Sequence, residues 1–137
     1  MRWLGIDPGQ RRVGLALSDE DGSFASPHKT LTRDDDASLL SQLCSEIADN
    51  QVREVVLGLP LRMNGEEGPE AKRARRLKAA IERAASVTVV LWDERLTTVA
   101  AERELRGVGM RGSKKKALLD QAAATLLLQS YLDARAR

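Results

Sequence analysis

The chain has 137 residues, of which 42% are hydrophobic, 31% charged and 3% aromatic, and its net charge is +2. This length suits one domain over residues 1–137 with an aliphatic core, and is too short for two. The small net charge means that any nucleic-acid contact must come from locally placed basic residues, and the scarcity of aromatic side chains argues against a surface that stacks bases.

No apolar stretch approaches membrane-spanning length, and the N-terminal residues do not resemble a signal peptide. The single cysteine, Cys44, allows no internal disulfide and favours a reducing compartment. We therefore expect a soluble, cytoplasmic protein with no membrane contact.

Hydrophobic patterns and turn residues predict the following order of elements. They are strands over 3–6, over 13–18 and from residue 23, a helix from Asp36, a strand over 54–59, a helix from Pro69, a strand over 87–92, a short helix from Thr98 to about Gly107, a loop over 107–116 and a last helix over 115–134.

Local chemistry supports several of these boundaries. Asp21 and Gly22 mark a hairpin turn, and Pro27 favours an edge position for the third strand. Asp36 suits a helix N-cap and Pro69 a first helical turn. The two later strands, being continuously apolar, are expected to be covered on both faces.

Hairpins followed by strand–helix alternation predict an α/β fold with a mixed sheet flanked by helices. Ligands of such sheets usually bind at the carboxyl ends of the strands. Asp7, residues 58–60 and the Asp93–Glu94 pair all lie at such ends, so we expect one pocket to gather them.

Asp120 stands out in the last helix because it shares a face with apolar Ala123, Ala124 and Leu127. If Ser113 caps this helix, Asp120 lies past the first turn, where the helix dipole no longer favours an acid. A buried carboxylate needs a partner, which is either an arginine or a metal ion.

Two other acids have structural explanations when taken alone, as a turn acceptor for Asp7 and a loop ion pair for Glu94. Bringing three carboxylates together, however, costs about 4 kcal/mol per pair at about 4 Å and moderate dielectric. Mg²⁺ or Mn²⁺ removes this conflict, and two such ions roughly 4 Å apart support phosphodiester cleavage by water. We therefore expect Asp7, Glu94 and Asp120 to be the metal ligands and catalytic residues of a nuclease.

Basic residues near the expected pocket are candidates for phosphate contacts. They are Arg12, Arg62, Arg95, Lys114, Lys115 and Lys116. For the three lysines, a solvated loop is an equally simple interpretation.

Four motifs occur in order along the chain: GIDPG with RVG (5–9, 12–14), VLGLP with NG (56–60, 64–65), DERLTT (93–98) and DQAAA (120–124). Over essentially the whole chain this pattern resembles the bacterial YqgF (RuvX) family, whose members are named pre-16S rRNA nucleases and Holliday-junction resolvases. DERLTT is the most specific of the four. The resemblance implies a ribonuclease H-like fold related to RuvC resolvases, Mg²⁺ or Mn²⁺ as cofactor, and an rRNA precursor or branched DNA as substrate.

The family's acidic positions correspond to Asp7, Glu94 and Asp120. Two departures from RuvC are visible. RuvC carries a second acid one turn further along the last helix, where this chain has Ala123, and its glutamate comes from the strand equivalent to the one that here ends at Gly58 and Leu59. The metal site therefore differs from that of RuvC in detail.

Two other functions stay open at this stage. Actin-like ATPases and sugar kinases share the general fold and also open with an acid before a glycine, as Asp7 does, although they close ATP between two domains. A non-catalytic RNA-binding factor in ribosome assembly would tolerate the absence of the fourth acid. A junction resolvase would favour a symmetric homodimer, which an RNA-processing nuclease does not need.

Overall fold

The computed structural model describes residues 1–96 and 113–136, and side chains from residue 117 onward in the second range. The strands are β1 (Arg2–Pro8), β2 (Arg12–Ser18), β3 (Ala25–Thr32), β4 (Val52–Leu59) and β5 (Thr88–Asp93). The helices are α1 (Asp36–Asp49), α2 (Pro69–Ala85), the short 3₁₀ helix η1 (Glu94–Leu96) and α4 (Ser113–Arg135).

The five strands form one mixed sheet in the order β3-β2-β1-β4-β5. β1 pairs antiparallel with β2 and parallel with β4, β2 pairs antiparallel with β3, and β4 pairs parallel with β5. The predicted mixed sheet is confirmed. β3 lies at an edge, as Pro27 predicted, because proline cannot donate a ladder hydrogen bond.

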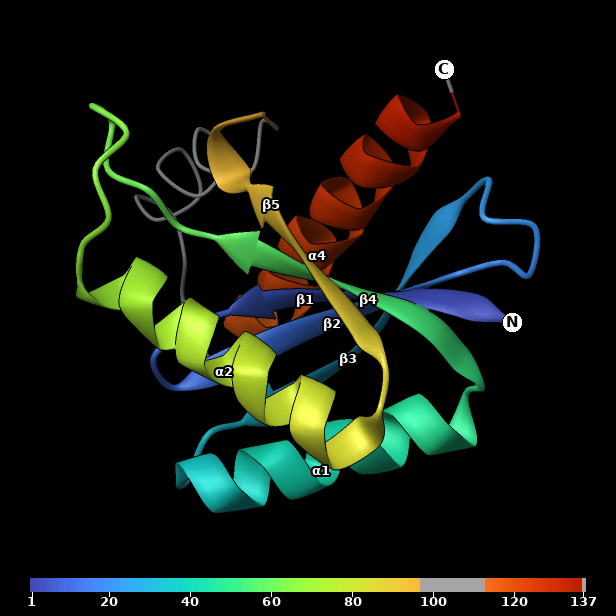
Figure 1. The fold of residues 1–137 in the computed structure, drawn as a ribbon, viewed down its shortest axis with the longest axis horizontal. Helices are drawn as coiled ribbons and strands as arrows, with labels where there is room; N and C mark the ends of the chain where they lie inside the picture. The colour runs from blue at the N-terminus through green and yellow to red at the C-terminus, as the bar shows by residue number, and fades with distance from the viewer. Residues whose placement is uncertain (97–112, 137) are drawn as a thin grey trace.

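Helices cover both faces of the sheet, with α1 and α2 on one side and α4 on the other (Figure 1). Successive side chains of β1 point to opposite faces of the sheet and so enter both cores. Leu4 and Ile6 point to α1 and α2, while Trp3 points to α4. The α4 layer buries Ala124, Leu128 and Leu132 against Trp3, Ala16 and Val56.

The backbone of α4 lies very close to β1 and β2. A Cβ on Gly5 would lie 2.8 Å from Leu128 Cβ, and one on Gly14 would lie 2.1 Å from the Asp120 carbonyl oxygen. Side chains at these two positions would push α4 away from the sheet. Glycine is therefore needed for this packing.

Most predicted elements are confirmed, and three details are wrong. Asp35, not Asp36, caps α1, and its carboxylate accepts a hydrogen bond from Ser38 N. β5 is an edge strand in which only Val89 is fully buried, and both of its faces are only partly covered, by Leu91 against the α1 and α2 core and by Trp92 against α4. Residues 113–116 form the start of α4 and not a loop, whereas the helix expected over 98–107 and the loop over 107–112 lie outside the described residues. Among the helices in the described ranges, none combines the length and apolar character required to cross a membrane.

Gly14→Ala should destabilise the protein, because the new methyl group meets backbone atoms of α4 that cannot rotate away. We expect a loss of about 1–3 kcal/mol in the free energy of unfolding, measured by urea titration. Gly68→Ala is the comparison, since its Cβ meets only the Arg62 side chain, at 3.0 Å or more, and the loss of glycine at the N-cap of α2 should cost less than about 1 kcal/mol. Equal effects of the two substitutions would contradict the close approach of α4.

Candidate active site

Asp7 lies in the middle of the sheet, inside β1 and not beyond its end, and its side chain is 1% exposed. It shares the α4 face with Trp3 and Gly5, because it alternates with Leu4 and Ile6 of the opposite core. Its neighbour on β2 is Gly14. On the other side the parallel register runs on from Ile6–Leu57 toward Gly58. Asp7 is thus flanked by two residues without side chains.

Asp120 of α4 lies next to this region because its backbone packs directly against Gly14. Its Oδ2 accepts a hydrogen bond from Arg12 Nε at 2.8 Å, and the two side chains are 20% and 33% exposed. Of the two partners considered for this inward-facing acid, the structure supplies the arginine. Arg12 and Asp120 are 108 residues apart in the sequence, so only the fold brings them together.

Glu94 arrives from the other side, in η1 directly after β5. Its side chain is 7% exposed, and its Oε1 lies only 2.8 Å from where a Cβ on Gly58 would be. The ion pair expected in this loop is made by its neighbours, since Arg95 donates to both carboxylate oxygens of Asp93, with Nη2–Oδ2 at 2.8 Å. Glu94 is therefore left facing the protein interior.

Burial raises the pKa of the Glu94 carboxyl from 4.5 to about 7, and the negative charge of Asp93 adds to this shift. Asp93 behaves in the opposite way, because its hydrogen bond from Arg95 lowers its pKa. Near pH 7 Asp93 is therefore ionised, whereas Glu94 lies close to the midpoint of its titration. Such a separation is common among functional carboxylates.

The three predicted acids therefore approach one stretch of the α4 face, Asp120 over Gly14 and Glu94 over Gly58, with Asp7 between them. Their oxygen donors are of the kind that Mg²⁺ and Mn²⁺ prefer. Within the described residues, however, no group of three or more acidic, histidine or cysteine side chains is placed to hold a metal ion. Asp7 and Glu94 thus fit such a site by chemistry and burial, whereas Asp120 in this arrangement is bound to Arg12.

The predicted phosphate-binding arginines lie around this region. Arg12 is bound to Asp120, while Arg62 is exposed in the β4–α2 loop with Glu66 4.0 Å away. Arg95 lies against the same loop, since its Nη1 is 3.4 Å from the position of a Cβ on Gly65. The side chains of Lys114, Lys115 and Lys116, and all of Thr97 and Thr98, lie outside the described residues.

The importance of Gly14 and Gly58 was missed at the level of sequence, although both occur in the motifs. A glycine inside an otherwise apolar strand signals the close approach of another group. Here those groups are the α4 backbone and the Glu94 carboxylate.

Comparison with known proteins adds evidence of kinship. A family model described as "RuvX: Holliday junction resolvase" matches residues 1–134. A protein of Chloroflexus aggregans named "Putative pre-16S rRNA nuclease" is 43% identical over 132 residues, covering 96% of this chain and 93% of the relative. A protein of the same name from Mycobacterium bovis (strain BCG / Pasteur 1173P2) is 45% identical over 135 residues, covering 98% and 79%.

Two solved structures share the fold. RuvC of T. thermophilus, in complex with a Holliday junction substrate, superposes with a TM-score of 0.64 at 17% identity, covering 99% of this chain and 96% of RuvC. The Fowlpox virus resolvase, in complex with Holliday junction DNA, gives a TM-score of 0.60 at 11% identity, covering 100% of each chain. The predicted ribonuclease H-like fold is therefore confirmed.

Glu94→Gln should flatten the pH dependence of stability in metal-free protein. Because folding raises the Glu94 pKa from 4.5 to about 7, the wild type binds more protons when folded over this interval. Its free energy of unfolding should therefore fall by on the order of 2–3 kcal/mol as pH rises from 4.5 to about 7, and then level off.

Urea titrations of wild type and Glu94→Gln across this interval measure the difference, with exposed Glu20→Gln as the matched control. Parallel curves for wild type and Glu94→Gln would show that Glu94 is not the buried titrating group.

Proposed function

This chain belongs to the RuvX family of nucleases, and we propose that it hydrolyses phosphodiester bonds in structured nucleic acid with divalent metal at Asp7, Glu94 and Asp120. The observation that carries this proposal is the burial of two acids on the α4 face: Asp7 and Glu94 are 1% and 7% exposed, and Glu94 lies against Gly58. Keeping carboxylates out of water is costly, and a cation in their midst offsets that cost.

Nucleases of this resolvase type generally use divalent metal ions, and we propose Mg²⁺ or Mn²⁺ here. Asp7 and Glu94 would hold the ion, and Asp120 would join them on release from Arg12. An ion held there would lower the pKa of a bound water molecule and stabilise negative charge on the leaving oxygen. Arg12 keeps the Asp120 carboxylate in place until then, and its freed guanidinium is suited to a substrate phosphate.

For the substrate we propose an rRNA precursor or branched DNA. Relatives named as pre-16S rRNA nucleases support the first, and the junction complexes of the two structural neighbours support the second. Phosphate contacts are assigned to Arg12, Arg62, Arg95, Lys114, Lys115 and Lys116. A single domain over residues 1–137, a cytoplasmic location and a homodimer on junction DNA stay predictions.

A second candidate is an RNA-binding factor that does not cleave. Its support is specific: Asp120 is neutralised by Arg12, and Ala123 stands where RuvC has its second helical acid. In that case the acids would serve stability alone, and metal would have no effect on RNA turnover.

Asp7→Asn should abolish metal-dependent cleavage while leaving the fold intact, because the two side chains have nearly the same shape. We expect a loss of at least about 100-fold in single-turnover rate with Mg²⁺ or Mn²⁺, and the same loss with EDTA. The substrates are a four-way DNA junction and an RNA with the precursor-type extension, so that the preferred one is measured directly.

Asp21→Asn is the matched control, since this exposed acid lies in the β2–β3 turn. Cleavage that survives both Asp7→Asn and chelation would refute the nuclease site proposed here. Tight RNA binding without cleavage under either metal would favour the second candidate.

A further inference from the structure

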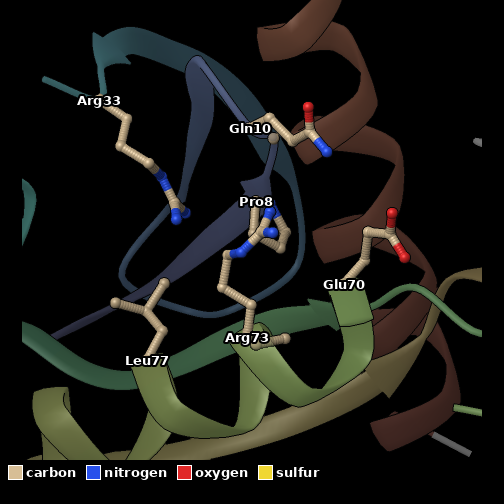
Figure 2. A pocket seen from close by; sticks show the side chains of 8 residues that line it. Pro8, Gln10, Arg33, Glu70, Arg73 and Leu77 are labelled. Carbon is tan, nitrogen blue, oxygen red and sulfur yellow. The ribbon is translucent and has the colours of Figure 1, made fainter. Parts of the chain in front are cut away.

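Two arginines face each other on the side of the sheet opposite the acids. Arg33 lies between β3 and α1, and Arg73 comes from α2. Figure 2 shows both side chains extending toward Pro8 from different sides, with their guanidinium groups directed to the same space. Two hollows adjoin the pair, and Arg33, Arg73 and Leu77 line both of them.

The smaller hollow holds about 30 Å³ beside Pro8, Gly9 and Gln10, at the turn that follows β1. The larger one holds about 260 Å³ between α1 and α2, and Arg76 is on its wall. A ligand could therefore reach the two guanidinium groups either from the β1–β2 turn or from the hollow between α1 and α2.

Arg33 lacks adequate partners for a buried cation. Its side chain is 11% exposed, and within the described residues its Nε has no hydrogen-bond partner. Its ion pair is with Asp36 at 3.6 Å, and that carboxylate is 90% exposed, so the interaction is weak. Burial lowers the pKa of Arg33; Asp36 opposes this shift and Arg73 adds to it.

Arg73 does not neutralise the positive charge of Arg33, because it is itself a cation. Arg73 also makes no ion pair within the described part of the chain. The remaining acid of the smaller hollow, Glu70, is on the far side of Pro8 from Arg33 in Figure 2. The region between the guanidiniums therefore combines positive charge with unused donors. An anion with several oxygens satisfies both.

We propose that Arg33 and Arg73 form a binding site for a phosphate group, separate from the acidic site. Planar guanidiniums are well matched to phosphate oxygens, and a partly buried pair excludes competing water. The phosphate belongs either to a nucleic-acid strand or to a free phosphate or mononucleotide.

A strand phosphate is the source favoured by position. Pro8 directly follows Asp7, yet Asp7 faces α4 while Pro8 lines the hollow of the arginine pair. A strand that crosses the β1–β2 turn would thus contact both sites. This assignment of the source rests on the proposed nuclease function, whereas phosphate binding itself does not.

The first test is thermal stabilisation by inorganic phosphate at constant ionic strength, with chloride as reference. Phosphate should raise the melting temperature of the wild type. The increase should be at most half as large in Arg73→Gln and absent in Arg33→Met. Arg73→Lys should restore part of the effect. Arg83→Gln, which removes the same charge from an exposed position on α2, should respond like wild type.

Arg33→Met also separates binding from structure. Replacing an inadequately paired buried charge by an apolar side chain should leave the melting temperature without phosphate unchanged or higher. A lower melting temperature with an intact phosphate effect would show that Arg33 is structural. Equal phosphate effects in Arg73→Gln and Arg83→Gln would overturn the site. So would an increase in melting temperature that chloride produces as well as phosphate, because binding would then not be specific for phosphate.

The second test identifies the source, using protein with Asp7→Asn so that substrate is not cut. Nucleic-acid affinity is measured as a function of salt. Arg73→Gln should lower the slope of log affinity against log salt by about one, and Arg83→Gln should not. An unchanged slope with a lost phosphate effect assigns the site to a free phosphate or mononucleotide and overturns the strand source. Retained cleavage in Asp7→Asn would reject the nuclease proposal and leave the phosphate site standing.

Discussion

The contact between the α4 backbone and the backbone of β1 and β2 is the constraint on which the acidic site depends. It exists because Gly5 and Gly14 present no side chain to the helix. Through it, Asp120 is carried onto the sheet beside Asp7, although the two residues belong to opposite ends of the chain. The same principle acts at Gly58, where the missing side chain leaves room for Glu94. The positions of Asp120 and Glu94 thus depend on the glycines that leave room for them.

Two of the three acids, Asp120 and Glu94, are accommodated in different ways. Asp120 is neutralised by Arg12, and Glu94 has its pKa raised to about 7 by burial and the nearby charge of Asp93. Neither arrangement is permanent, since an ion pair can exchange partners and a proton can leave. A protein with such acids can accept a cation without unfolding its core, which is the property that the proposed nuclease requires.

The sheet separates two regions of opposite charge. Acids face α4, whereas Arg33 and Arg73 lie on the α1 and α2 side, and the β1–β2 turn joins the two. A polyanion that binds Arg33 and Arg73, and also Arg62 of the β4–α2 loop, would pass the acidic site without meeting a purely negative surface. Because Arg33 and Arg73 lie on the other side of the sheet, they would not compete with a metal ion for Asp7 and Glu94.

Among the described residues, sequence alone determined the kinds and order of the strands and helices, because hydrophobic period and turn residues such as Pro69 and Asp21 act within a few neighbours. It also identified the acids, whose motifs are local. Tertiary structure decided the rest. The edge position and partial burial of β5 follow from strand order, and the partner of Asp120 lies 108 residues away in Arg12. Burial and pairing depend on what packs against a residue from distant parts of the chain, and local periodicity carries no record of that.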